Sequence, residues 1–256
     1  MIIDKRKIID MMGKGLRLDG RKADEFRKMK VEYGITKSAE GSARVTLGDT
    51  IVLAGVKMEV TKPYPDTPNQ GGLMVGAELL PMSSPDFESG PPSEWAIEVA
   101  RVVDRGVRES HAIDVEKLVL KKGELVWNVI VDIVTVNDAG NILDASAVAV
   151  LAALKDTKLP KLEKDIIDYK AGLTKDKLPI DELPIAVTVY KIGKEMFVDP
   201  TNDEEKQIDA RLTITLIENG SLCSLQKGGE ETLTMEEIDK MVDIAAKHAK
   251  TLRKEL

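Results

Sequence analysis

Apolar residues alternate with polar ones along much of the first half of the chain, and this period of two predicts β-strands. The predicted strands lie at residues 28–35, 41–47, 50–60, 75–82 and 126–136. Gly48-Asp49 is expected to join two of them as a hairpin turn. Residues 126–136 are apolar at almost every position, which is typical of a strand buried on both faces or at the centre of a sheet.

A period of three to four residues predicts helices before, between and after these strands. The predicted helices lie at residues 1–12, 93–111 and 142–155, and from Thr234 toward the end of the chain. Ser93 is the expected N-cap of the helix at 93–111, and Thr234 forms a capping box with Glu237. The helix at 142–155 is dominated by Ala, Val and Leu, so we expect it to be buried nearly all round.

A change of composition separates the two halves of the chain. Residues 157–184 are rich in Lys, Asp and Pro, and further strands are predicted after them, at residues 185–192, 195–198, 210–217 and 222–226. Each half therefore holds strands followed by helices, which indicates an α+β chain of two lobes. We expect a first domain at residues 1–156, a linker at 157–184 and a second domain at 185–256.

Composition narrows the classes of protein to which the chain can belong. Of its 256 residues, 43% are hydrophobic and 32% are charged, which supports a packed core and excludes a disordered chain. The net charge of -7 excludes a wholly basic nucleic-acid binder, although it does not exclude a local basic patch. Aromatic residues make up only 4%, which argues against binding of single strands on stacked aromatic side chains.

Features of metal, cofactor and membrane proteins are scarce in the sequence. One cysteine and two histidines exclude a cysteine-rich zinc site and a multi-histidine centre, and no Walker loop is present, so we expect no metal and no cofactor. The longest nearly apolar run, residues 145–154, is half of the ~20 residues that a membrane span needs. Charged residues close to Met1 interrupt the pattern of an export signal, and we expect a cytoplasmic protein.

Three arginines of the predicted helix at 93–111 are the first candidate binding residues. Arg101, Arg105 and Arg108 are spaced so that they share one helical face. A guanidinium group binds phosphate through two hydrogen bonds, so this row suits a phosphate-rich partner such as RNA. The spacing alone favours a solvated face instead, in which Glu98 pairs with Arg101 and Asp104 pairs with Arg108.

Two segments carry a resemblance to a known family. Residues 16–27, Leu-Arg-Leu-Asp-Gly-Arg-Lys-Ala-Asp-Glu-Phe-Arg, strongly resemble the first motif of the RNase PH family, and the hairpin at 41–56 is similar as well. Residues 87–94 and 143–146 resemble the non-catalytic RNase PH-like subunit of the archaeal exosome core. The resemblance covers nearly the whole chain and implies two RNase PH-type lobes, each a mixed sheet covered by helices.

The resemblance also implies partners. In that family, an active and an inactive subunit alternate in a six-membered ring, a trimer of heterodimers that carries RNA-binding cap subunits. The ring degrades single-stranded RNA from its 3′ end by phosphorolysis. Basic residues of one helix in the inactive subunit contact RNA near the partner's active site, and Arg101, Arg105 and Arg108 match them by position.

Departures from the active members imply that this chain is a non-catalytic subunit. Where active members place Thr or Ser and then Arg to hold phosphate, this chain has Asn141 and Ile142. In the second half, Arg211 stands where a catalytic carboxylate is expected, and Glu205 stands where active members have Asp. The two residue sets therefore form a degenerate phosphate site and a degenerate carboxylate site, and we expect no catalytic residue.

Two alternatives remain open. The acidic run at residues 199–205 follows a predicted strand, and carboxylates of such a run hold Mg²⁺ or act as an acid–base pair in other proteins. The chain would then be an active phosphorolytic exoribonuclease that uses Asp199, Asp203 and Glu205. In the other alternative, the chain is a scaffold without RNA contact, and its arginines pair with acidic residues of a partner.

Overall fold

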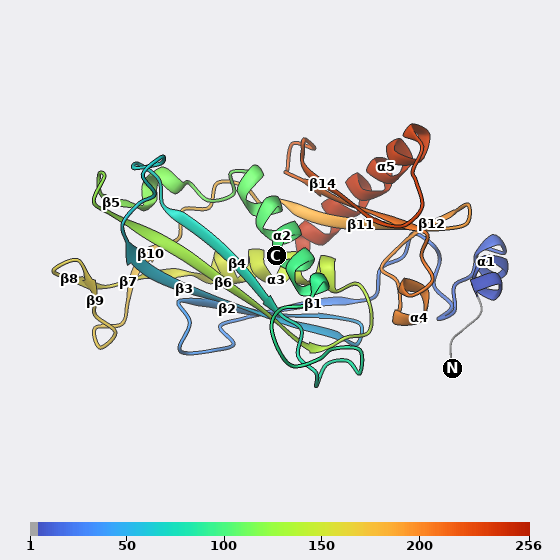
Figure 1. Cartoon of the computed structure of the whole chain (residues 1–256), viewed down its shortest axis with the longest axis horizontal. Helices are drawn as coiled ribbons and strands as arrows, with labels where there is room; N and C mark the ends of the chain where they lie inside the picture. Colours follow the sequence, from blue (N-terminus) through green and yellow to red (C-terminus); the bar gives the residue numbers. More distant parts are fainter. Residues whose placement is uncertain (1–4) are drawn as a thin grey trace.

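Two β-sheets, one from each half of the chain, form the framework of the fold (Figure 1). The computed structural model describes residues 5–256. Helix α1 (Lys5–Gly13) confirms the predicted N-terminal helix from residue 5 onward, and residues 1–4 of that prediction lie outside the described part of the chain. The mixture of sheets and helices confirms the α+β fold class.

The first sheet is mixed, and β6 is one of its interior strands. Its strands are β1 (Met29–Tyr33), β2 (Gly41–Leu47), β3 (Thr50–Thr61), β4 (Gly72–Glu78), β5 (Val119–Lys121) and β6 (Leu125–Asn137). The order is β1-β2-β3-β6-β4, and β4 pairs with β6 in parallel while the other pairings are antiparallel. The prediction of burial on both faces is wrong, because one face carries the buried Val131 whereas Asp132 on the other face is exposed; β6 is an interior strand that pairs with neighbours on both sides.

Strand β4 starts and ends earlier than predicted, at Gly72 and Glu78 rather than at residues 75 and 82. Its parallel register with β6 sets these bounds, because Gly72 lies opposite Asn128. A Cβ atom on Gly72 would lie 2.2 Å from Asn128 Oδ1, so a larger residue there would require the Asn128 side chain to move. The preceding loop is correspondingly shorter than the predicted one.

Helix α3 (Ile142–Asp156) packs against both sheets, on β2 and β3 from one side and on β11 (Ile185–Ile192) from the other. Residues 142–154 are all buried, which confirms the prediction of a helix buried nearly all round. Helix α2 (Glu94–Glu109) packs against β4 and α3. Its predicted cap is confirmed, because Ser93 Oγ accepts a hydrogen bond of 3.2 Å from the Ala96 amide.

The second sheet is antiparallel throughout, so only the first of the two sheets is mixed. Besides β11, it contains β12 (Glu195–Val198), β13 (Ala210–Leu216) and β14 (Leu222–Gly229), in the order β12-β11-β13-β14. Helix α5 (Met235–Leu252) packs on β11 and β13 and begins with the predicted capping box of Thr234 and Glu237. A one-turn helix, α4 (Asn202–Glu205), was not predicted and lies within the acidic run.

The lysine-rich segment between the lobes contains short strands. They are β7 (Lys158–Pro160), β8 (Leu162–Glu163), β9 (Ile166–Ile167) and β10 (Leu173–Lys177). β7 pairs with β10, β8 pairs with β9, and the β8–β9 hairpin lies at one end of the molecule (Figure 1). The domain limits drawn from composition stay a prediction. Among residues 5–256, no helix is long and apolar enough to cross a membrane.

Candidate functional site

A pocket of about 210 Å³ lies where the two lobes meet. It brings together Ile142 from the start of α3, Glu205 from α4 and Arg211 from β13, which the sequence placed in two separate motifs. The remaining lining residues are Asp86, Phe87, Trp95, Asp138, Asn202, Lys206 and Ile208. The first residue of α3 and the two residues from the second half of the chain therefore face a single space.

Asn141 directly precedes the pocket-lining Ile142 and is fully buried. Its backbone is in the left-handed region (φ 59°), which asparagine tolerates better than most residues. Its Nδ2 donates to Asp144 Oδ2 at 3.0 Å and to Asp199 Oδ1 at 3.1 Å. Its Oδ1 accepts from the Tyr190 hydroxyl at 3.2 Å. The amide is therefore fully engaged within the protein.

Ile142 lines the pocket but is only 2% exposed. It offers hydrocarbon at the first turn of α3, where the resemblance places a phosphate-binding arginine in active members. An alkyl group forms no charge-assisted hydrogen bond to an anion. Ile142 therefore lines the pocket with hydrocarbon and provides no charge that could hold an anion.

Glu205 is one of the carboxylates that line the pocket. Its Oε2 accepts from the backbone N–H of Asn141 at 3.1 Å, and its Oε1 lies 3.2 Å from the Tyr190 hydroxyl, whose single proton it shares with Asn141 Oδ1. Burial raises the pKa of Glu205 to about 7, and the neighbouring Asp138 adds to the rise. Burial likewise raises the pKa of Asp144 to about 7, although Thr188 donates two hydrogen bonds to this carboxyl group.

Arg211 joins the two lobes at the side of the pocket. Its Nη2 lies 2.7 Å from Glu98 Oε1 on α2, and its guanidinium group lies over the Trp95 ring at 4.8 Å from the centroid. Gly228 makes room for it, since a Cβ atom there would lie 2.5 Å from Arg211 Cζ. The expected pair of Glu98 with Arg101 is therefore wrong, because Glu98 pairs with Arg211 across the lobe junction.

The acidic run does not form an open carboxylate cluster. Asp199 is fully buried and lies 2.8 Å from Arg21 Nη1 and 2.6 Å from Arg27 Nη2. Glu204 is also buried and accepts from Arg17 Nε at 3.0 Å. Asp203 is exposed. In the described part of the chain, no group of three or more His, Cys, Asp or Glu residues is arranged to hold a metal ion.

The three buried pairs explain the N-terminal motif at residues 16–27. The segment that carries Arg17 and Arg21 lies on the second lobe, where α1 packs against β12, and its arginines neutralise the carboxylates that follow β12. Arg27 also donates to the carbonyl oxygens of Ala139 and Gly140 before α3, which belong to the first lobe. The sequence analysis assigned no role to these arginines. The sequence feature that could have indicated these ion pairs is an arginine-rich motif in one half of the chain together with an acidic run in the other half.

Arg101, Arg105 and Arg108 lie on the exposed face of α2 and do not line the pocket. The predicted pair of Arg108 with Asp104 is confirmed, with Nη2 2.7 Å from Asp104 Oδ1, and this hydrogen bond raises the pKa of Arg108. Arg108 also donates to the Leu73 carbonyl at 2.9 Å. Neither Arg101 nor Arg105 forms a hydrogen bond or ion pair with any residue of the described range 5–256.

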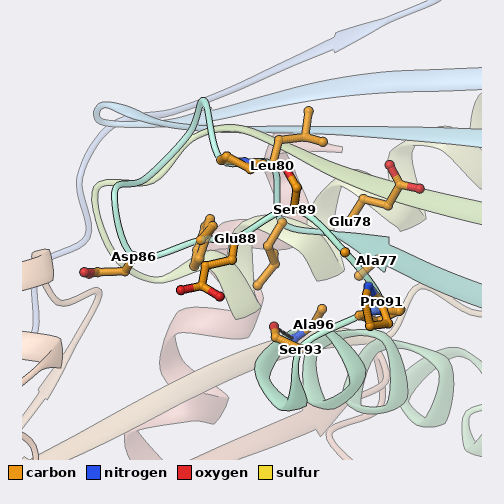
Figure 2. Close-up of a pocket in the computed structure, with 14 residues that line it drawn as sticks. Ala77, Glu78, Leu80, Asp86, Glu88, Ser89, Pro91, Ser93 and Ala96 are labelled. Atoms are coloured by element: carbon orange, nitrogen blue, oxygen red, sulfur yellow. Dashed lines mark hydrogen bonds between the residues drawn. The ribbon is translucent and has the colours of Figure 1, made fainter.

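A larger hollow of about 630 Å³ adjoins the pocket and shares Asp86 and Phe87 with it. It lies between the end of β4 and the first turn of α2, where Ser93 and Ala96 form one wall (Figure 2). Three carboxylates, those of Glu78, Asp86 and Glu88, line it without any basic residue. This hollow is therefore unsuited to binding a phosphate group.

Comparisons with known proteins agree with the two-lobe arrangement. Models of domains 1 and 2 of the 3′ exoribonuclease family, RNase PH, match residues 25–160 and 182–248. The chain is 45% identical over 255 residues to exosome complex component Rrp42 of Methanocella arvoryzae, covering 99% of this chain and 95% of the relative. It is 47% identical over 238 residues to the Rrp42 component of Archaeoglobus fulgidus, covering 93% of this chain and 89% of the relative.

Solved structures give the same result. A chain of the Archaeoglobus fulgidus exosome with RNA bound to the active site superposes with a TM-score of 0.91 at 44% identity, covering 98% of this chain and 96% of that chain. A chain of an archaeal exosome core superposes with a TM-score of 0.86 at 41% identity, covering 98% and 95%.

Proposed function

Because the chain belongs to the 3′ exoribonuclease family, RNase PH, we propose that it is a non-catalytic, RNA-guiding subunit of an exosome core. In this role it pairs with an active RNase PH-like paralogue and helps to form that paralogue's active site. The pairs assemble into a six-membered ring, a trimer of heterodimers, that degrades single-stranded RNA from the 3′ end by phosphorolysis. Cap subunits bind the ring, and the assembly is cytoplasmic.

The observation that carries the non-catalytic role is the chemistry of the pocket at the lobe junction. Ile142 supplies no charge for phosphate, and Arg211 is engaged by Glu98 and Trp95. The carboxylate of Glu205 faces the same space. A phosphorolytic site has to hold a phosphate nucleophile, and this pocket lacks a free cationic group at the helix terminus to do so.

The RNA-guiding role is supported by the outer face of α2. Arg101 and Arg105 are exposed and have no partner within residues 5–256, so their guanidinium groups are available to phosphates. Arg108 is held by Asp104, and we assign it the smaller share of RNA contact. The scaffold alternative uses the same two free arginines for a protein partner, so an RNA-binding measurement separates the two.

The alternative of an active exoribonuclease requires Asp199, Asp203 and Glu205 to act together. Asp199 is buried and ion-paired with two arginines, and Asp203 is exposed and does not line the pocket. Neither Asp199 nor Asp203 therefore lies in the pocket as a carboxylate partner for Glu205. These contacts favour the non-catalytic role over a shifted active site.

The test is the phosphate-dependent release of nucleoside diphosphates from polyadenylate RNA. The chain alone is expected to release none, and its mixture with the active paralogue is expected to exceed the paralogue alone. Release by the purified chain alone would overturn the non-catalytic role. A mixture no faster than the paralogue alone would overturn the claim that this chain helps to form the active site.

A further inference from the structure

The lysine-rich segment between the lobes projects at one end of the molecule (Figure 1). The projecting segment is defined here as residues 158–177, which contain β7 to β10. Its middle is a closed loop, because the Lys161 N–H donates to the Gly172 carbonyl at 3.1 Å. In the β8–β9 hairpin, Leu162 lies opposite Ile167, and both pack against the core. One face of the hairpin therefore anchors it, and the other face is directed to solvent.

Three large apolar side chains of the projecting segment are exposed. Ile166 is 72% exposed, Tyr169 is 70% exposed and Leu173 is 40% exposed. The Tyr169 ring is held in place, because Lys57 Nζ of β3 lies 5.5 Å from its centroid and is itself hydrogen-bonded to Glu40 Oε1 at 2.6 Å. A group of exposed apolar side chains marks a contact site for another protein, and a side chain that is already held in place loses little entropy on binding.

The projecting segment also carries an excess of positive charge, although the whole chain has a net charge of -7. It holds six lysines and four acidic residues. Of the acidic residues, Asp165 is ion-paired with Lys121 of β5, and Asp168 accepts hydrogen bonds from two backbone N–H groups. The lysines form no ion pair within the part of the chain that the structure describes; they are Lys158, Lys161, Lys164, Lys170, Lys175 and Lys177. Their charge is therefore available to an acidic partner.

The turn of the β8–β9 hairpin holds one of these lysines at its tip. Lys164 and Asp165 are the two residues of the turn, and both have a positive φ, of 49° and 69°. Asparagine and glycine are the residues that such a turn favours, so a lysine is accommodated there at an energetic cost. Asp165 is fixed by its ion pair with Lys121, whereas Lys164 is exposed. Strain of this kind is concentrated where a side chain serves a function, which indicates that the charge at the tip is used.

We propose that the projecting segment is a docking surface for an acidic segment of a partner protein. Carboxylates of the partner pair with the lysines, and its apolar side chains cover Ile166, Tyr169 and Leu173. RNA fits this surface less well, because Ile166 and Leu173 are aliphatic and Tyr169 is the only aromatic residue of the segment on which a base could stack. The inference goes beyond the proposed function, since it holds whether or not the chain is catalytic.

The experiment uses the full chain and a labelled peptide in which pairs of glutamates alternate with single leucines. Binding is followed by fluorescence anisotropy and is compared with that of a second peptide, which has serine in place of leucine. We expect the leucine peptide to bind about tenfold more tightly, because it also buries apolar surface. Ile166→Ser combined with Tyr169→Ser is expected to abolish this difference between the peptides.

Substitutions of the lysines test the charge of the surface. Lys164→Glu combined with Lys170→Glu is expected to weaken binding of both peptides by about tenfold, because the new carboxylates repel those of the peptide. Lys240→Glu combined with Lys250→Glu, both exposed on α5, is the charge-matched control and is expected to bind as the unmodified chain does. Lys164→Asn separates binding from folding. Asparagine suits the turn, so we expect a higher thermal midpoint of unfolding together with weaker peptide binding.

Absence of peptide binding would overturn the proposal, and so would equal losses in the lysine variant and its control. Equal affinities for the leucine and serine peptides, or full affinity in Lys164→Asn, would also contradict it. Labelled polyadenylate distinguishes a protein partner from RNA. If Lys164→Glu combined with Lys170→Glu loses as much affinity for polyadenylate as for the peptides, the surface binds RNA and the proposal is wrong.

Discussion

The arginines at residues 17–27 and those on α2 are the same residue type in opposite surroundings. Arg17 is 1% exposed and reaches Glu204, while Arg21 and Arg27 surround the fully buried Asp199. Arg101 and Arg105 are exposed and have no partner within the described residues. A buried guanidinium group needs a carboxylate to offset its desolvation, whereas an exposed one stays hydrated and free to meet a phosphate.

Two charged motifs that look alike in the sequence differ in whether their side chains are paired in the structure. In the sequence, the arginine row of α2 and the acidic run at 199–205 are both candidate binding sites. In the structure, the acidic run is half of a set of ion pairs that hold the N-terminal motif on the second lobe, whereas the arginine row is left without partners at two positions within the described residues. The acidic run and the arginine row therefore differ in whether the charged groups are free to meet a ligand.

Removing a buried arginine is expected to have the largest effect. Arg17→Ala leaves Glu204 buried without its cation, so we expect a decrease of about 3–5 kcal/mol in the free energy of unfolding. Urea denaturation followed by circular dichroism measures this decrease. The matched control is Arg101→Ala, for which we expect a change within about 0.5 kcal/mol. Equal decreases in the two variants would remove the distinction between structural and available arginines.

Glu205 extends the comparison to an acidic residue. It belongs to the same run as Asp199 but is not hydrogen-bonded to an arginine. Its pKa of about 7 in the folded chain exceeds the unfolded value of ~4.3, so the folded protein retains a proton that the unfolded chain has released. The free energy of unfolding therefore falls as pH rises from about 4 to 7. We expect Glu205→Gln to reduce this fall by about 1–3 kcal/mol.

Denaturation midpoints measured between pH 5 and 8 test this prediction. Burial lowers the pKa of His248, which acts in the opposite direction and costs stability as pH falls below about 6.5. That contribution is common to the variant and the unmodified chain and cancels in the difference. Glu230→Gln, which changes an exposed carboxylate, is expected to leave the pH profile unchanged. A Glu205→Gln profile parallel to that of the unmodified chain would contradict the prediction.

Charge reversal on α2 tests the available arginines. In the assembled complex, Arg101→Glu combined with Arg105→Glu is expected to weaken binding of single-stranded RNA by about tenfold. The dependence of log K on log salt is expected to become shallower by about 0.7 for each phosphate that the variant no longer binds. Fluorescence anisotropy with labelled polyadenylate measures both quantities. Lys175→Glu combined with Lys177→Glu, both exposed on strand β10, serves as a charge-matched control. Unchanged affinity in the double variant would favour the scaffold alternative.

Arg211 is intermediate between the buried arginines and the exposed arginines of α2. It is partly exposed and paired with both Glu98 and Trp95. Arg211→Met keeps the aliphatic part of the side chain but removes the ion pair and the cation–π interaction. We expect a decrease of about 1 kcal/mol in the free energy of unfolding, because both interactions are partly screened by solvent. Arg211→Lys is expected to recover part of it. A decrease as large as that of Arg17→Ala would place Arg211 among the buried structural arginines.

The sequence by itself determined the local elements of this protein. The strands β2 and β3 with their turn at Gly48, the cap at Ser93 and the capping box of Thr234 and Glu237 all appear where the pattern placed them. The residues at the degenerate turn, Asn141 and Ile142, were also visible in the sequence. Periodicity, turns and caps are decided by residues a few positions apart, so the information is complete within each segment.

Only the tertiary structure decided which charged residues pair and which stay free. Glu98 pairs with Arg211 rather than with Arg101, and the partners Arg27 and Asp199 are 172 residues apart in the chain. The start of β4 likewise depends on its parallel register with β6. These outcomes follow from the packing of two sheets around α3, which brings distant segments within hydrogen-bond distance, and no local spacing in the sequence encodes that proximity.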